Sequence, residues 1–129
     1  MSILLNGTAL AYIGDAIYEL EIRKYLVTKK LTKVNDLHSA AIRFTSAIGQ
    51  AYVAEKLITE MLTETEMEYY RRGRNATSSR KARHADLKTY HQSTGFEALL
   101  GFLFFDGQIV RLAEIIDFCI RKIEELESN

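Results

Sequence analysis

Apolar residues recur at helical spacing along most of this chain, and no other feature constrains its fold as strongly. In the first such segment the spacing is i, i+3, i+7, i+10, carried by Leu10, Ile13, Ile17 and Leu20. This spacing lines one face of a helix. No proline occurs among the 129 residues, so no helix has to tolerate a missing backbone N–H. The pattern predicts an all-α bundle of about six helices.

Capping residues and glycines suggest where the first helices begin and end. The first is expected to run from Thr8, as N-cap, to residues 28–30. Residues 34–62 are expected to form one or two helices, with Gly49 marking a break or a close contact. Thr63 and Glu66 form a capping box that starts another helix, and Gly73 is its expected end.

The second half of the chain contains a polar segment followed by two apolar ones. Residues 74–86 lack apolar periodicity and predict an exposed loop. Residues 87–105 are apolar nearly all round and predict a buried helix. Residues 106–126 predict an amphipathic helix, whose apolar side consists of Ile109, Leu112, Ile115, Ile116, Cys119, Ile120 and Ile123.

Size and composition indicate one intracellular domain. A chain of 129 residues that is 47% hydrophobic can bury a sizeable core, so residues 1–129 are expected to form a single domain. The single Cys119 cannot form an internal disulfide, which favours a reducing, cytoplasmic location. The first residues do not resemble a secretory signal. The uncharged apolar run at 98–105 is far shorter than the ~20 residues of a membrane span.

Two helices each carry one isolated carboxylate in apolar surroundings. Asp15 is the only charge between residues 9 and 18, and Glu97 is the only charge from 93 to 105. An unpaired ionised carboxylate in apolar surroundings is costly unless it is paired, hydrogen-bonded or bound to a cation. The neighbouring Gly14, Gly95 and Gly101 would let these two helices pack closely and bring the carboxylates together. Alternatively, each carboxylate faces solvent on a narrow stripe or hydrogen-bonds a neighbouring helix end.

Two convergent acids without a buried basic partner nearby in sequence indicate a divalent cation. Mg²⁺ is often held by one or two carboxylates and keeps several waters. On helical geometry Thr94 lies on the side of Glu97, and Glu19 lies on the side of Asp15. Glu19 is either an additional acid of this cluster or an ordinary exposed residue. The three histidines, His38, His84 and His91, lack the spacing of metal ligands. The sequence also contains no arrangement of residues typical of covalent catalysis.

A strongly basic segment is hidden in a chain of zero net charge. Residues 71–88 carry seven Lys and Arg against one Asp, a local net charge of +6. Such a segment suits contacts with nucleic-acid phosphates, although many charge runs are simply solvated loops. The residues expected to make such contacts are Arg71, Arg72, Arg74, Asn75, Lys81 and Arg83. Together with the acid pair, they point to metal-assisted phosphodiester chemistry.

The two acidic segments resemble a known family. "LAYIGDAIYEL" and "TGFEALLGFLFFDG" resemble the two acidic helices of the ribonuclease III catalytic domain, in the same order and around a similar basic segment. Two acids usual in the family are replaced by Ala11 and Thr94, and no double-stranded RNA-binding domain is expected after residue 129. These departures, together with "VNDLHSAAI", "RRGRNA" and "TYHQSTGFEALLG", resemble the stand-alone branch of the family, mini-ribonuclease III.

The resemblance implies a specific activity and assembly. It implies a homodimeric endoribonuclease that cuts double-stranded RNA with Mg²⁺, for which Mn²⁺ could substitute, and that leaves 5′-phosphate and 3′-hydroxyl ends. Its substrate would be large-subunit (23S) ribosomal RNA, which a ribosomal protein could present. Asp15 and Glu97 would be catalytic metal ligands, with Thr94 supporting a water, and Tyr12 would lie at the dimer interface.

The sequence is also compatible with two other functions. The chain could be a catalytically inactive RNA-binding domain of the same fold, because two of the family's acids are missing. It could instead be a protein-interaction bundle, in which Asp15 and Glu97 satisfy buried donors and the basic segment docks an acidic partner.

Overall fold

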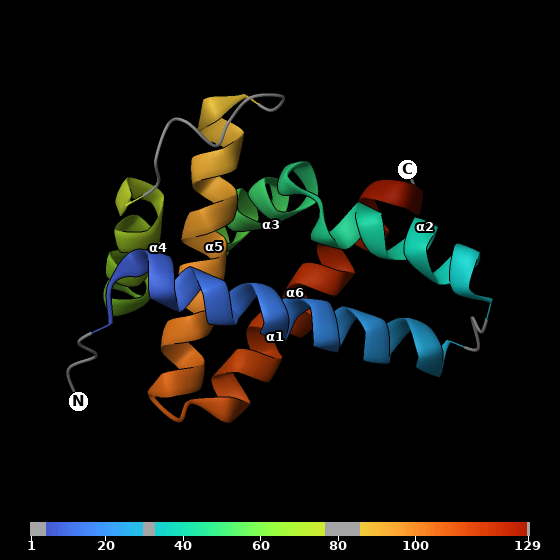
Figure 1. The fold of residues 1–129 in the computed structure, drawn as a ribbon, viewed down its shortest axis with the longest axis horizontal. Helices are drawn as coiled ribbons and strands as arrows, with labels where there is room; N and C mark the ends of the chain where they lie inside the picture. The colour runs from blue at the N-terminus through green and yellow to red at the C-terminus, as the bar shows by residue number, and fades with distance from the viewer. Residues whose placement is uncertain (1–4, 30–32, 77–85, 129) are drawn as a thin grey trace.

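The computed structural model describes residues 5–29, 33–76 and 86–128, and this part of the chain consists of six α-helices and no strand (Figure 1). The all-α prediction is confirmed. In chain order, the helices are α1 (Gly7–Thr28), α2 (Val34–Thr45), α3 (Ala47–Glu60), α4 (Glu64–Ala76), α5 (Leu87–Phe105) and α6 (Ile109–Ser128).

Helix α5 is the central element of the bundle, and the prediction that residues 87–105 form a buried helix is confirmed. It packs against α1, α3, α4 and α6, and α1 crosses it in Figure 1. Its buried side chains point in nearly every direction around the helix axis and include Phe96, Leu99, Leu100, Phe102 and Leu103. A helix that is hydrophobic all round is stable only when other elements cover it on several sides.

The structure corrects one predicted boundary in the first half of the chain and decides between the two alternatives for Gly49. Asn6, not Thr8, caps α1, because its side chain accepts a hydrogen bond of 2.8 Å from the Ala9 N–H. The break between α2 and α3 lies at Ser46 rather than Gly49. The Ser46 hydroxyl accepts a 3.1 Å hydrogen bond from the Gly49 N–H and so caps α3. Gly49 instead makes a close contact, because a Cβ there would lie 2.4 Å from the Arg43 carbonyl oxygen.

The capping box at the start of α4 is confirmed, but its predicted end is wrong. The Thr63 N–H donates to the Glu66 carboxylate at 2.9 Å, and the Glu66 N–H donates to the Thr63 hydroxyl at 3.2 Å. The helix then continues through Gly73 to Ala76. Gly73 serves packing rather than termination, since a Cβ there would lie 2.4 Å from the Ala98 Cβ. Residues 74–76 of the predicted loop are therefore helical, and 77–85 lie outside the described residues.

The amphipathic pattern of α6 is confirmed with one exception. Leu112, Ile115, Ile116, Cys119, Ile120 and Ile123 are buried, but Ile109, in the first turn, is exposed. Leu20 of α1 is also exposed, although the periodicity places it on the apolar face. Within the described ranges, no helix is both long and apolar enough to cross a membrane.

Candidate active site

Two glycines allow the backbones of α1 and α5 to touch where the helices cross. A Cβ on Gly14 would lie 1.7 Å from the carbonyl oxygen of Glu97, and a Cβ on Gly101 would lie 2.0 Å from that of Leu10. No side chain fits at either position without moving a backbone, so only glycine permits this crossing. The contact brings the segment that carries Asp15 against the turn that carries Glu97.

Asp15 and Glu97 therefore lie together, although they are 82 residues apart in the sequence. Asp15 is exposed and Glu97 is partly buried. The pKa of Glu97 is raised to about 8, first by burial and then by the charge of Asp15 and a hydrogen bond shared with it. A hydrogen bond with Gln50 acts in the opposite direction. Near neutral pH, the pair without a cation therefore retains a proton, because two adjacent carboxylates resist simultaneous ionisation.

The donor set of this pair fits a hard divalent cation. A cation between the two carboxylates would relieve the repulsion that otherwise favours protonation of Glu97. In the described part of the chain, no group of three or more His, Cys, Asp or Glu side chains is placed to hold a metal. Two carboxylates are nevertheless a sufficient protein contribution for Mg²⁺, which usually retains several waters.

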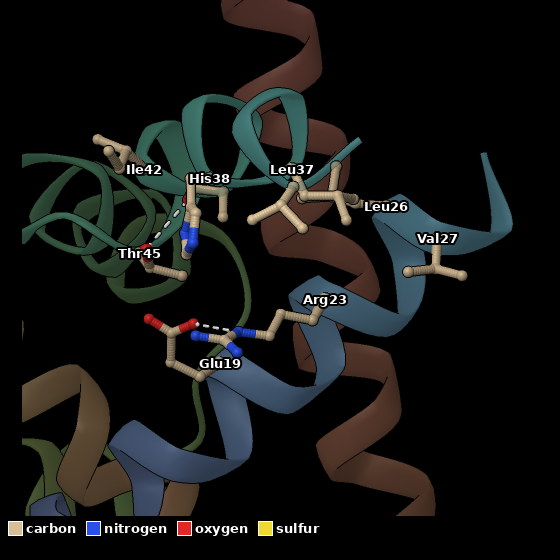
Figure 2. A pocket seen from close by; sticks show the side chains of 10 residues that line it. Glu19, Arg23, Leu26, Val27, Leu37, His38, Ile42 and Thr45 are labelled. Atoms are coloured by element: carbon tan, nitrogen blue, oxygen red, sulfur yellow. Dashed lines mark hydrogen bonds and ion pairs between the residues drawn. The ribbon is translucent and has the colours of Figure 1, made fainter. Parts of the chain in front are cut away.

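The two residues predicted to support the site have other partners. Glu19 accepts a hydrogen bond of 3.1 Å from Arg23 and lines a pocket of about 310 Å³ between α1 and α2 (Figure 2). The Thr94 hydroxyl donates to the Tyr90 carbonyl oxygen at 3.1 Å, within its own helix. The structure thus shows Glu19 in an ion pair with Arg23, and among the described residues it does not belong to a group of three acids that could hold a metal. Thr94 is partly buried and precedes Glu97 on α5 by about one helical turn.

Gln50 is a neighbour of the acid pair that the sequence analysis missed. It lies on α3, is 1% exposed, and hydrogen-bonds the Glu97 side chain. The available signal was a neutral amide within the apolar stretch "AIGQAYVA". An isolated polar residue on an apolar helix is the same type of signal that identified Asp15.

The described members of the predicted RNA-binding set lie together at the end of α4. They are Arg71, Arg72, Arg74 and Asn75, whereas Lys81 and Arg83 lie outside the described residues. Gly73, in the middle of this group, packs against the Thr94–Ala98 turn of α5, which carries Glu97. The basic end of α4 is therefore adjacent to the turn that supplies one of the two carboxylates.

Tyr12 lies on the outer surface of α1. Its side chain is 81% exposed, and Leu20, two turns further along the same helix face, is 58% exposed. An exposed aromatic ring near an exposed leucine is a feature of surfaces that contact other proteins. Packing within the described part of the chain does not explain why these two exposed side chains are apolar.

The chain is similar to known proteins of one family. The ribonuclease III domain family matches residues 8–108. The chain is 51% identical over 122 residues to mini-ribonuclease 3 of Enterococcus faecalis, a match that covers 94% of this chain and 92% of that protein. It is 47% identical over 122 residues to mini-ribonuclease 3 of Streptococcus pneumoniae, covering 94% of this chain and 95% of that protein.

Similarity also extends to a solved structure. A crystal structure of a protein from Fusobacterium nucleatum superposes with a TM-score of 0.83 at 27% sequence identity, over 92% of this chain and 94% of that one. The family match covers well over half of the chain, and the relatives match over nearly their whole length. The chain therefore belongs to the ribonuclease III family of endoribonucleases, alongside the proteins named mini-ribonuclease 3.

Proposed function

We propose that this protein is a Mg²⁺-dependent endoribonuclease that cleaves double-stranded RNA and acts in the maturation of 23S ribosomal RNA. The observation that carries the proposal is the convergence of Asp15 and Glu97 at the α1–α5 crossing, beside the basic end of α4. Acids that hold a cation next to arginines that hold phosphates are the parts that phosphodiester hydrolysis requires. The buried free thiol of Cys119 is consistent with action in the cytoplasm.

Asp15 and Glu97 would hold the cation, and Mn²⁺ could replace Mg²⁺. When bound, this cation supplies Lewis-acid stabilisation of the charge that develops on the phosphate and lowers the pKa of a nucleophilic water. The close α1–α5 backbone contact would limit movement of the two carboxylates relative to each other, which favours a preorganised site. Thr94, on the same helix as Glu97, would hydrogen-bond a water at the site, and Glu19 would act there only after leaving Arg23.

The basic end of α4 would position the RNA backbone. Arg71 is exposed, and Arg74 and Asn75 line a pocket of about 520 Å³ between the end of α4 and the start of α5. Lys88 and His91 line the same pocket from α5. Contacts of this type neutralise phosphates without reading sequence, which suits an enzyme whose substrate is a duplex. Lys81 and Arg83 remain proposed contacts in the same region.

A homodimer would place two such sites on one duplex. Tyr12 is the proposed centre of the dimer interface, because it is a large aromatic side chain that the protomer leaves exposed. A two-fold interface uses the same patch on both protomers. One site could then cut each strand, and a ribosomal protein could present the RNA in a suitable shape.

Cleavage of an RNA stem tests this function directly. The purified protein is incubated with a 23S ribosomal RNA stem and Mg²⁺, next to the variants Asp15→Asn and Glu97→Gln. We expect cuts with 5′-phosphate ends for the wild type, and a loss on the order of 100-fold or more for each variant, the scale on which removing one preorganised electrostatic group lowers a rate.

Each alternative function predicts a different outcome of the same experiment. A folded wild-type protein that binds the stem and leaves it intact would indicate an RNA-binding domain without catalysis. Binding to an acidic peptide but not to the stem would indicate a protein-interaction bundle. Variants that cut as fast as the wild type would show that Asp15 and Glu97 are not the catalytic acids.

A further inference from the structure

A buried series of hydrogen bonds links α2, α3 and α5 close to Glu97. The Ser93 hydroxyl on α5 donates to the Gln50 side-chain oxygen on α3 at 2.6 Å. The Gln50 amide nitrogen donates to the Thr45 carbonyl oxygen at the end of α2, at 3.3 Å. Gln50 is 1% exposed and Ser93 is 8% exposed. Polar groups this deeply buried are costly unless they are hydrogen-bonded, so the series is a specific arrangement.

These hydrogen bonds determine how the Gln50 amide is oriented. A carbonyl oxygen can only accept, so Thr45 must face the NH₂ end of the amide. The Ser93 hydroxyl faces the oxygen end. An amide NH₂ group has two N–H donors, and Thr45 uses one of them. The other is free to donate to a carboxylate.

Glu97 is a carboxylate with which the Gln50 side chain interacts, and this interaction lowers the pKa of Glu97. Ser93 and Glu97 are four residues apart on α5, so they lie on one face of the helix. Gln50 contacts this face and hydrogen-bonds the Glu97 side chain. The other polar partner of Glu97 is Asp15, which carries like charge. Gln50 is thus the neutral donor that can hold the Glu97 carboxylate in one orientation.

We infer that Gln50 is a positioning residue, whose amide is oriented by Thr45 and Ser93 and holds the Glu97 carboxylate ready to bind a divalent cation. This inference rests on the proposed function of Glu97. Metal-binding carboxylates depend on such hydrogen-bonded neighbours, and loss of one typically weakens metal binding about 10–100-fold. A ligand held by packed neighbours also loses less side-chain entropy when the cation binds.

The test measures binding of Mn²⁺ alone to the RNA-free protein, with free Mn²⁺ quantified by electron paramagnetic resonance. Gln50→Met keeps the length of the side chain but removes the amide, and we expect the apparent Kd to rise about 10-fold or more. Ser93→Ala removes only the hydroxyl and leaves the hydrogen bond between Gln50 and Thr45 in place, so the Gln50 amide keeps one of its two orienting partners. We therefore expect a smaller rise in the apparent Kd, of roughly 3-fold. In the Glu97→Ala background, Gln50→Met should have no further effect on Mn²⁺ binding.

Arg111→Met is the control for a purely structural effect, because Arg111 contacts Glu66 and Met61 rather than the acid pair. It should lower the free energy of unfolding and leave the Kd for Mn²⁺ unchanged. An unchanged Kd in folded Gln50→Met protein overturns the inference. If Gln50→Met does not fold, an unchanged Kd in Ser93→Ala overturns it equally.

The same titrations separate this inference from the proposed function. If Glu97→Gln binds Mn²⁺ as tightly as the wild type, the metal site itself is wrong, and the role of Gln50 is overturned with it. If Glu97→Gln abolishes binding while Gln50→Met and Ser93→Ala leave it unchanged, the metal site stands and only the role of Gln50 is overturned.

Discussion

At the level of single residues, the site depends on one carboxylate with an unusual proton affinity. The pKa of Glu97 is raised from 4.5 to about 8, first by burial and then by Asp15. The folded protein therefore keeps a proton that the unfolded chain releases between these two pH values. Stability contributed by this group is fully present below about pH 4.5 and is lost as the pH rises towards 8.

Substitution of this carboxylate should change how stability depends on pH. In EDTA, we expect Glu97→Gln to gain stability relative to the wild type as the pH rises from 5 to 9. The gain should be on the order of a few kcal/mol, since a tenfold change in proton affinity corresponds to about 1.4 kcal/mol. Urea unfolding at several pH values measures it. Parallel curves for the two proteins would contradict the raised pKa.

Gly14 permits the close backbone contact between α1 and α5. Gly14→Ala should destabilise the protein by about 3 kcal/mol or more and reduce Mn²⁺ binding, because the added Cβ would meet the Glu97 backbone at 1.7 Å. Gly107→Ala is the matched control. Gly107 has a φ of 73° and nothing within 4 Å of an added Cβ, so it should cost only about 1 kcal/mol. Equal losses measured by urea unfolding would show that steric conflict at the crossing is unimportant.

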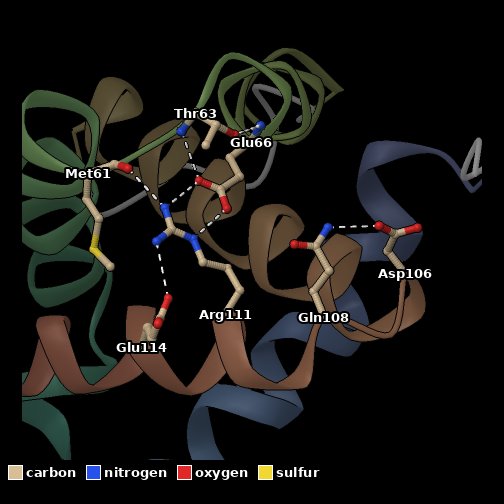
Figure 3. A network of polar contacts seen from close by, with 7 residues as sticks. All are labelled: Met61, Thr63, Glu66, Asp106, Gln108, Arg111 and Glu114. Atoms are coloured by element: carbon tan, nitrogen blue, oxygen red, sulfur yellow. Dashed lines mark hydrogen bonds and ion pairs between the residues drawn. The ribbon is translucent and has the colours of Figure 1, made fainter.

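At the level of helices, one arginine connects α6 to the start of α4. Arg111 donates to both oxygens of Glu66, at 2.8 and 2.9 Å, and to the Met61 carbonyl oxygen at 2.9 Å (Figure 3). Glu66 is 4% exposed. Burial raises the pKa of its carboxyl, but hydrogen bonds from Arg111 and Thr63 outweigh burial and lower the pKa overall. The capping box of α4 is thereby tied to α6.

Removing this arginine should leave a buried carboxylate with fewer partners. Arg111→Met should lower the free energy of unfolding by about 2–4 kcal/mol at pH 7, near the lower end of values for broken buried ion pairs. The loss should shrink at low pH, where Glu66 becomes protonated in both proteins. Arg121→Met, on an exposed part of α6, should change stability by less than about 0.5 kcal/mol. Similar losses for both variants in urea unfolding would contradict the role of Arg111.

Across the whole molecule, the predicted RNA-binding arginines and the predicted dimer residue lie on different helices. The net charge is zero, but the described arginines of the predicted RNA-binding set gather at the end of α4. Tyr12 and Leu20 lie on α1, and neither is covered by the protomer. RNA binding and self-association are therefore expected to use different surfaces, so they can be disrupted independently.

The assembly is predicted to depend on the α1 surface. Tyr12→Ser combined with Leu20→Ser should shift the protein from dimer to monomer in sedimentation equilibrium, because truncating large apolar side chains at the centre of an interface typically costs about 2 kcal/mol or more. Val110→Ser removes a side chain that is 76% exposed on α6, and it should leave the association constant unchanged. A double variant that remains as dimeric as the wild type would place the interface elsewhere.

RNA binding is predicted to depend on the end of α4. Replacing Arg71 and Arg74 with Gln should reduce the slope of log affinity against log salt by about 0.9 for each phosphate that is no longer neutralised. Replacing the exposed Arg23 of α1 with Gln should leave the slope unchanged. Binding of an RNA stem in EDTA at several salt concentrations gives the slope. Equal slopes for the wild type and the α4 variant would show that these arginines do not contact phosphates.

The helical class, the capping box and the identity of the two unusual acids could all be predicted from the sequence. Each of these is a local property: apolar spacing selects helices, the Thr63–Glu66 pair satisfies its own helix end, and an isolated charge is visible without knowing its neighbours. The role of Gly73 was misjudged, and that of Gly49 was left open between a break and a close contact, because a glycine can end a helix or permit a close contact. Only the neighbouring helix distinguishes the two.

The surroundings of those acids could not be predicted, because they depend on how the helices pack. The fold brings Asp15 to Glu97 through the Gly14 and Gly101 contacts, and it places Gln50 behind them. These relations join residues that periodicity cannot connect, since helical spacing reports only which face of one helix is apolar. Asp15 and Glu97 could be identified from the sequence, but only the tertiary structure brings them together, because α1 and α5 pack closely enough for their backbones to touch.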